Sequence, residues 1–461
     1  MKSKIKIYCW ILIMTVFFCC ESKRDSSRVT VGLQPSVEDT LNIKIPQWQT
    51  EYNVPAVAVG LIEDGQVKMA KVYGEHQKGS KASVNTIFNV ASIAKTVVAM
   101  TTLKLIDNGQ WDLDEPLHNY WVDPDVINDS LSLQLTTRHI LNHTTGFKNW
   151  RRMYSDQKLS FDFKPGTRYQ YSGEGFEYLS AALEKRFDIK WTKLVDSLVF
   201  KPMDMKDATF TWLKDVDTLR FAHWYDGNGI QHDVYYKTHW VSAADDLLVT
   251  INDLSNFGIE VMKGNFISQD LFNQMVTPQI KIHNNADYGL GWTIIKDLPN
   301  GEYAINHDGG DAGVATTMVL LPNSKNGIIV LTNGDNGSII CKKVIKEVIG
   351  VGKEIVNKIY WGTDIPNIVD VSEERLKKYA GIYKSTLGTQ MNFIKKKNTL
   401  EVYGTGIPRL TLYPESENAF FPLDFDIRFV FREDDKGNVN SIDIVQGGKV
   451  TLTGIRENNQ P

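Results

Sequence analysis

The 461-residue sequence is longer than most single compact domains, so its length favours two or more domains. Charged residues make up 23% of the chain and the formal net charge is -4. This balance lacks the basic excess that nucleic-acid binding requires, and we expect no nucleic-acid partner.

Residues 1–20 have the layout of an export signal. Lysines near the start precede an apolar run over residues 7–18, which ends at Cys19 and Cys20. This run is shorter than the about 20 residues that a transmembrane helix needs. We therefore predict a signal peptide over residues 1–20, followed by a polar tether over residues 21–40.

A cysteine at the end of such a run, followed by polar residues, resembles a bacterial lipoprotein signal. The resemblance implies an exported protein of the periplasm or cell envelope, lipidated at Cys20 or alternatively at Cys19, with no other membrane contact. Phe17 and Phe18 stand where such signals usually have small residues, so an ordinary secretory signal is the alternative. After the signal only Cys341 remains, which excludes a disulfide framework and predicts a buried core cysteine.

The first folded elements are predicted to be a β-hairpin. Strand-like residues 56–62 and 67–73 flank a turn at Asp64-Gly65. A second hairpin is predicted near residue 320, where residues 316–321 and 328–332 flank a turn containing Asn326-Gly327. Both pairs are expected to be antiparallel.

Apolar residues at helical spacing predict helices between these hairpins, over residues 92–108, 176–187 and 244–263. Strands at both ends that enclose helices indicate an α+β fold. We predict an antiparallel sheet flanked by helices, with a mainly helical subdomain.

The character of the chain changes after Asp370. Short alternating segments, such as residues 390–393 and 427–431, are separated by turns at 397–398 and 436–438. We predict a small all-β domain here. The resulting domain boundaries are 41–355 for the main domain, 356–369 for a linker and 370–461 for the β domain.

One serine and one lysine are candidates for catalysis. A serine three residues before a lysine occurs three times, as Ser3/Lys6, Ser92/Lys95 and Ser155/Lys158. Only Ser92 opens a long apolar helix, where residues i and i+3 share a face and the helix dipole favours an oxyanion. Burial of Lys95 would lower its pKa, as a general base requires. The alternative is that Ser92 only caps the helix.

The segment Phe88–Thr96 resembles the first motif of the class C β-lactamase and penicillin-binding-protein-like serine hydrolases. Two further segments, 109–116 and 138–147, are similar to scaffold turns of this family, and the resemblance extends from about residue 45 to 336. In the family, the histidine at the position of His143 belongs to a structural loop. The resemblance thus implies a β-lactamase/transpeptidase-like fold.

The segment 165–176 resembles the second motif of the family, and the resemblance implies that Tyr171 is the catalytic tyrosine. Its phenol would exchange protons with Ser92 and Lys95, and the lysine charge would favour phenolate. A core tyrosine is the alternative. Gly173 stands where many members have an asparagine that binds the substrate's amide, which removes a contact for β-lactams. Glu174 is expected to contact substrate or to be a solvated loop carboxylate.

The segment beginning at His307 is similar to the third motif, with histidine in place of lysine. The resemblance implies that His307 hydrogen-bonds to the Tyr171 or substrate region, while Gly309 and Gly310 let substrate backbone approach closely. It also implies an oxyanion hole made by the backbone N–H groups of Ser92 and Gly310. A histidine-glycine turn without function is the alternative.

The C-terminal segments 379–383 and 412–416 are similar to the lipocalin-like β domain of some peptidase-like members. Together these features predict a serine hydrolase that forms an acyl-enzyme on an ester or amide, with peptidase or esterase activity that includes D-amino-acid peptides. The alternatives are a class C-like β-lactamase and a non-catalytic envelope protein that binds peptidoglycan or another glycan.

Other chemistry finds no support in the sequence. It has no His-Glu-x-x-His, phosphate-binding loop or metal-type Cys/His cluster, so no metal or other cofactor is expected. The substrate is expected to be a small molecule, peptide or ester, selected by the loops at 148–164 and 211–239. Trp150, Trp224 and Trp240 either line the cleft or pack. The sequence makes no prediction of oligomeric state.

Overall fold

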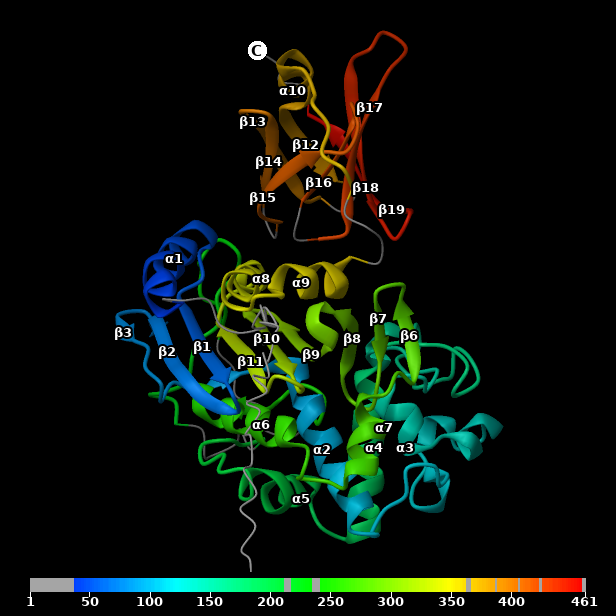
Figure 1. Cartoon of the computed structure of the whole chain (residues 1–461). Helices are drawn as coiled ribbons and strands as arrows, with labels where there is room; N and C mark the ends of the chain where they lie inside the picture. Colours follow the sequence, from blue (N-terminus) through cyan, green and yellow to red (C-terminus); the bar gives the residue numbers. More distant parts are fainter. Residues whose placement is uncertain are drawn as a thin grey trace, which may run out of the picture. The chain divides into compact units, whose positions relative to one another are not determined.

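The central element of the fold is an antiparallel β-sheet. The computed structural model describes residues 37–210, 217–233, 241–361, 366–385, 388–404, 407–422 and 425–457. Within these residues nine strands form the sheet in the order β3-β2-β1-β11-β10-β9-β8-β7-β6 (Figure 1). Their bounds are β1 Ala56–Glu63, β2 Gln66–Gln77, β3 Ser80–Lys81, β6 Ile280–His283, β7 Ala286–Tyr288, β8 Thr293–Leu298, β9 Glu302–Asp311, β10 Val314–Leu321 and β11 Asn326–Thr332.

Helices cover both faces of this sheet, so its central strands are buried on both sides (Figure 1). Along β1, Val57 and Val59 pack with α1 and α8, whereas Ala58 and Ile62 pack with α2 and α6. This alternation is the period of two of a strand. The helix bounds are α1 Val37–Tyr52, α2 Ala94–Asp107, α3 Thr137–Leu141, α4 Gly173–Phe187, α5 Trp191–Val195, α6 Ile251–Lys263, α7 Gln269–Val276, α8 Gly337–Val348, α9 Gly352–Tyr360 and α10 Glu373–Tyr379.

The first predicted hairpin is confirmed, and the second is confirmed with a different turn. Asp64 and Gly65 both have positive φ and join β1 to β2 as expected. In the second hairpin, Asn326 and Gly327 already belong to β11 and pair with β10, so the turn lies at residues 322–325. The observed turn therefore precedes the predicted Asn326-Gly327 turn by a few residues.

The predicted helices at 92–108 and 176–187 are present with shifted ends, while the third starts later than predicted. Helix α6 begins only after Thr250, whose hydroxyl accepts a hydrogen bond from the backbone N–H of Asp253 in a capping box. Residues 244–250 instead form a turn and the short strand β5 (Leu248–Val249), which pairs with β4 (Phe88–Asn89). This turn matters because it contacts the candidate site.

The predicted C-terminal β domain is confirmed as a closed barrel. In the described part of the chain, eight strands follow one another around it in sequence order. Aromatic side chains such as Tyr383, Phe393 and Phe431 are buried inside and contact one another at ring-centroid distances of 5.3–5.7 Å. Its strands are β12 Gly381–Ser385, β13 Gln390–Lys396, β14 Thr399–Gly404, β15 Ile407–Pro414, β16 Ala419–Pro422, β17 Ile427–Glu433, β18 Val439–Gln446 and β19 Lys449–Arg456.

Two helices extend across the predicted domain boundaries. Helix α1 begins at Val37, inside the predicted tether, and α9 ends at Tyr360, inside the predicted linker. The signal peptide with Cys19 and Cys20 lies outside the described residues, so the boundaries remain predictions. Among the described residues, no helix is both long enough and apolar enough to span a membrane.

Candidate active site

Ser92 lies on a sharp turn between a strand and a helix. Strand β4 ends at Asn89, the 3₁₀ turn η1 (Ala91–Ile93) carries Ser92, and α2 follows. Ala91 has φ of 44°, which is rare for a residue with a Cβ, and the Asn89 side chain accepts a hydrogen bond from its N–H at 2.6 Å. This turn presents the half-buried Ser92 hydroxyl to a cavity.

Lys95 is fully buried and lies directly behind Ser92. Its Nζ is 2.9 Å from Ser92 Oγ and 2.9 Å from the carbonyl oxygen of Ala244, to which it donates. Burial lowers the pKa of Lys95 to about 8, although the negative charges of Asp245 and Glu177 oppose the shift. The direction expected from the sequence is confirmed, and part of the amine is neutral near pH 8.

Tyr171 lies just before α4 and faces the same two residues. The Ser92 hydroxyl hydrogen-bonds to its phenol, and Lys95 Nζ is 5.0 Å from the centre of its ring. Burial raises the pKa of Tyr171 above its usual value, and the charges of Asp245 and Asp308 add to this effect. The raised pKa of Tyr171 favours a protonated phenol over the expected phenolate, because burial is the largest influence on this group.

His307, on β9, is buried beside this group. Its Nδ1 is 2.7 Å from the Asp308 carbonyl oxygen, and because a carbonyl only accepts, Nδ1 carries the proton. Nε2 is then an acceptor, and it has no hydrogen-bond partner among the described residues. Burial and the Lys95 charge lower the pKa of His307 to about 3. A neutral imidazole thus occupies the position where the resembling family has a cationic lysine.

His143 packs against Tyr171 but is fully engaged elsewhere. Its Nδ1 accepts a hydrogen bond from the Ser172 backbone N–H at 3.1 Å, so Nε2 donates to the Tyr288 hydroxyl at 3.2 Å. Its ring lies 4.2 Å from that of Tyr171, centroid to centroid. Both nitrogens are used, which fits the structural role expected for His143.

The two glycines of the third motif have different surroundings. A Cβ at Gly309 would lie 2.1 Å from the Val90 carbonyl oxygen, whereas a Cβ at Gly310 would meet nothing within 4 Å. Gly309 therefore lets β9 pack against the turn that carries Ser92, and its approach to substrate stays a prediction. Gly310 lines the cavity next to Ser92. Its part in an oxyanion hole stays a prediction.

The loop before η5 (Arg151–Met153) occupies the space beside Gly173. A Cβ at Gly173 would lie 2.9 Å from the Trp150 ring and 3.1 Å from the Asn149 carbonyl oxygen. The Asn149 side-chain oxygen also accepts a hydrogen bond from the Gly173 N–H at 2.8 Å. A side chain at position 173 would force the Trp150 ring or the Asn149 backbone to shift.

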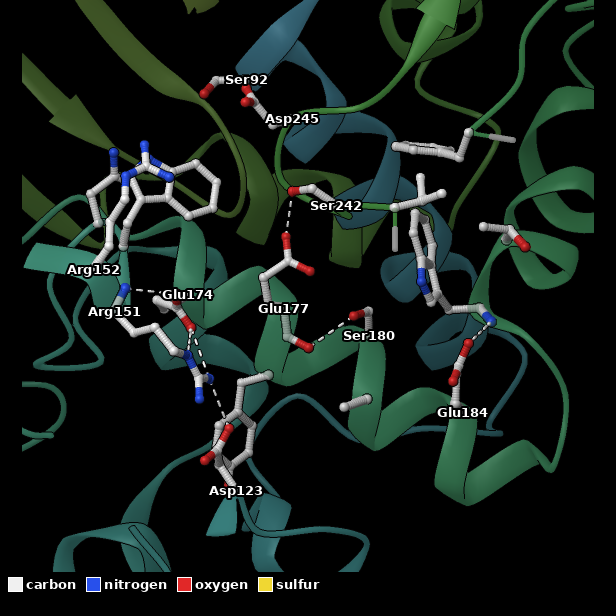
Figure 2. A pocket seen from close by; sticks show the side chains of 18 of the residues that line it. Ser92, Asp123, Arg151, Arg152, Glu174, Glu177, Ser180, Glu184, Ser242 and Asp245 are labelled. Carbon is white, nitrogen blue, oxygen red and sulfur yellow. Dashed lines mark hydrogen bonds and ion pairs between the residues drawn. The ribbon is translucent and has the colours of Figure 1, made fainter. Parts of the chain in front are cut away.

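Glu174 is not a solvated loop carboxylate, since it lies on α4 and is buried at the edge of the cavity. It is buried and forms an ion pair with Arg151 at 3.0 Å, and Arg151 also binds Asp123 at 2.9 Å and Asp125 at 3.1 Å. The expected solvated loop carboxylate is wrong, because Arg151, 23 residues earlier, forms an ion pair with a buried Glu174, while a substrate contact by Glu174 stays a prediction. This cluster fixes the loop that carries Trp150 (Figure 2).

Ser92, Gly310 and the loop that carries Asn149, Trp150 and Arg151 line a cavity of about 1050 Å³. Helix α4 lines it with a stripe of side chains that includes Glu174, Glu177 and Glu184 (Figure 2). Trp150 lines this cavity, whereas Trp224 is buried and packs edge-on against Phe221, and Trp240 lies outside the described residues. The size suits a ligand as large as a short peptide.

The sequence interpretation missed Asn149 and Glu177, although a usable signal existed for Glu177. Acidic residues recur on α4 at positions 174, 177 and 184, which share one helix face. A polar stripe on an otherwise buried helix indicates the face that borders a cavity. Asn149 carried no such signal, because its contact with Gly173 depends on the folded loop.

A family model described as Beta-lactamase matches residues 39–339, well over half of the chain. The chain belongs to the β-lactamase family. It is therefore a serine hydrolase, and the geometry brings Ser92, Lys95 and Tyr171 together beside the cavity.

Two curated relatives and one solved structure are similar to this β-lactamase family member. Penicillin-binding protein 4* of Bacillus subtilis is 23% identical over 407 residues, which cover 78% of this chain and 86% of the relative. The D-alanyl-D-alanine-carboxypeptidase/endopeptidase AmpH of Escherichia coli is 21% identical over 318 residues, covering 61% and 80%. A penicillin-binding protein homologue from Pyrococcus abyssi has a TM-score of 0.61 at 18% identity, covering 91% and 100%, which shows a shared fold.

Gly173→Asn is expected to destabilise the protein by about 1–3 kcal/mol, because the new side chain overlaps Trp150. Denaturant unfolding measures this cost. The double variant with Trp150→Ala should be destabilised by less than the sum of the two single changes, since the overlap is gone. Gly310→Ala is the control, because its Cβ meets open space. Equal stability of Gly173→Asn and the wild type would contradict this packing.

Proposed function

We propose that the protein hydrolyses a peptide or ester through an acyl-enzyme on Ser92, with Lys95 as the general base. The observation that carries this proposal is the hydrogen bond between Ser92 and a fully buried lysine whose pKa lies near 8. An amine with this pKa accepts a proton at moderate pH, when an ordinary lysine would be almost fully charged.

In the proposed reaction, neutral Lys95 takes the Ser92 proton as Oγ attacks the substrate carbonyl carbon. The backbone N–H groups of Ser92 and Gly310 hold the oxyanion, each worth roughly 3 kcal/mol. Tyr171, a protonated phenol, passes a proton to the leaving group and recovers one from Lys95. Water then attacks the acyl-enzyme through the same groups in reverse and releases the acid.

The surroundings of Ser92 favour a peptide or ester over a β-lactam. The Trp150 ring fills the space beside Gly173, and His307 is neutral, so two polar contacts expected in a β-lactam site are replaced. Asn149 lines the cavity, and its amide nitrogen is a donor suited to a peptide carbonyl. The relatives that act on D-alanyl-D-alanine make peptides with D-amino acids the first class to test.

We also propose export and lipidation at Cys20, supported by the layout of residues 1–20. Radiolabelled palmitate should be incorporated into the full chain in a bacterial host and lost in Cys20→Ala. Cys19→Ala is the matched control, and loss of label in that variant alone would move the site to Cys19.

Ser92→Ala is expected to lower hydrolysis of p-nitrophenyl esters and D-alanyl peptides by at least about 10³-fold, because the nucleophile is gone. Release of p-nitrophenol or D-alanine measures the rate. Ser155→Ala is the matched control, since exposed Ser155 also precedes a lysine by three residues. Wild-type rates in Ser92→Ala would contradict the mechanism. Failure of a fluorescent phosphonate to label the wild type would support a non-catalytic binding protein.

The pH dependence of kcat/KM is expected to follow Lys95. Since the base must be deprotonated, activity should rise with pH through a midpoint near 8, the pKa to which burial lowers this lysine. Initial rates of ester hydrolysis from pH 5.5 to 10 test this. A midpoint near 6.5 would instead indicate a histidine base.

Nitrocefin is expected to be a poor substrate compared with esters. A missing hydrogen-bond partner for its amide costs about 1–3 kcal/mol, or roughly 10- to 100-fold in kcat/KM. The measurement compares nitrocefin with p-nitrophenyl butyrate on the same enzyme. A kcat/KM for nitrocefin above that for the ester would favour the class C-like β-lactamase.

A further inference from the structure

Glu177 is a carboxylate with an unusual place in the cavity. It extends from α4 toward the turn at residues 242–244 (Figure 2). One carboxylate oxygen accepts hydrogen bonds from Ser242 Oγ at 2.5 Å and from the Ala244 N–H at 3.2 Å, and the other from the Ala243 N–H at 3.4 Å. Glu177 thus binds three donors of one short turn.

The same turn anchors the candidate base. Ala244 gives its N–H to Glu177, and its carbonyl oxygen accepts the hydrogen bond from Lys95 Nζ at 2.9 Å. Residues 242–244 belong to no helix or strand, and apart from Glu177 the turn is held by Asp246, whose carboxylate accepts a hydrogen bond from the Ser242 N–H at 2.7 Å. A shift of this turn would move the Ala244 carbonyl, and with it the amine that lies 2.9 Å from Ser92 Oγ.

The charge of Glu177 is costly for folding. Burial raises its pKa to about 7, which means that the fold favours the protonated form. Its stabilising contribution is therefore present at low pH and is lost as pH rises through about 7. A glutamine would keep the main acceptor oxygen without this cost. A carboxylate that is retained where an amide would be more stable indicates a functional role.

Apart from Glu177, Asp245 is the group near Lys95 whose negative charge favours the protonated amine. Of the groups facing the amine, the phenol of Tyr171 is protonated and the imidazoles of His143 and His307 are neutral, because burial disfavours their charged forms. The negative charges that oppose burial at Lys95 come from Asp245 and Glu177. Glu174, on the same face of α4, forms an ion pair with Arg151, and its negative charge raises the pKa of Glu177.

We propose that Glu177 is a positioning residue for Lys95, which holds the turn that anchors the amine and tunes with its negative charge how readily the amine accepts a proton. The inference rests on the proposed role of Lys95 as base. Helix α4 would then both line the cavity and carry the residue that positions Lys95. Glu177 does not touch the reacting atoms and acts through Ala244 and through its charge.

Two substitutions separate these effects. Glu177→Gln keeps the oxygen that binds Ser242 and Ala244 but removes the charge, so the pKa of Lys95 should fall. The midpoint of kcat/KM against pH is expected about one unit lower than in the wild type, with the plateau within about threefold. Glu177→Ala also removes the hydrogen bonds, and its plateau should fall about tenfold or more, because the base is no longer held in place.

Stability provides an independent readout. Since the charge of this half-buried carboxylate is disfavoured above about pH 7, Glu177→Gln should unfold at the same or a higher temperature than the wild type at pH 8.5. Ser242→Ala removes the hydrogen bond to Glu177 and the one that Ser242 Oγ accepts from the Ala244 N–H, without removing a charge, so its midpoint should move by less than that of Glu177→Gln. Glu184→Gln also removes a charge from α4, at a residue that forms an ion pair with Lys190. This variant should keep the wild-type midpoint of kcat/KM against pH.

The outcomes distinguish this inference from the proposed function. If Ser92→Ala is inactive but Glu177→Gln has the wild-type pH profile, the inference is wrong and the mechanism stands. If Glu177→Gln is less stable at pH 8.5 and its midpoint is unchanged, Glu177 is only structural. Wild-type turnover by Ser92→Ala overturns both.

Discussion

The buried amine of Lys95 is the constraint on which the site depends. Removing a lysine from water disfavours its charge, and the protein accepts this cost because the resulting pKa near 8 makes the amine a base. Two hydrogen bonds hold it, one to Ser92 and one to the Ala244 carbonyl. Helices α2 and α4 and the 242–244 turn pack around this amine, exclude it from solvent and fix its orientation.

The other departures from ordinary packing gather around the same point. Ala91 has a left-handed backbone next to the nucleophile, Glu177 is a carboxyl with a pKa near 7, and His307 is buried with one nitrogen unpartnered among the described residues. Each is unfavourable alone, and strain of this kind is expected at catalytic sites. The sheet behind them packs alternate residues of β1 into cores on its two faces.

Much of the fold was predictable because local patterns determine it. The alternation along β1 and the Asp64-Gly65 turn fix a hairpin without distant partners. The spacing of Ser92 and Lys95 likewise places two side chains on one helical turn, and their contact follows. In contrast, the state of the Tyr171 phenol depends on burial by distant segments, and the ion pair of Glu174 depends on a loop that precedes it by more than 20 residues. No sequence pattern carries such contacts.

Gly173 and His307 stand where the resembling family has asparagine and lysine, and both replacements fit the surrounding side chains. Arg151 binds three carboxylates and so fixes the loop in which Trp150 occupies the space beside Gly173. Across the site, His307 is neutral because it is buried near a lysine that already carries the site's positive charge. A second buried cation there would raise the cost of protonated Lys95 and lower its pKa further. Histidine in place of lysine at position 307 therefore keeps the pKa of Lys95 near 8. It also removes a positive charge that could bind an anionic group of a substrate.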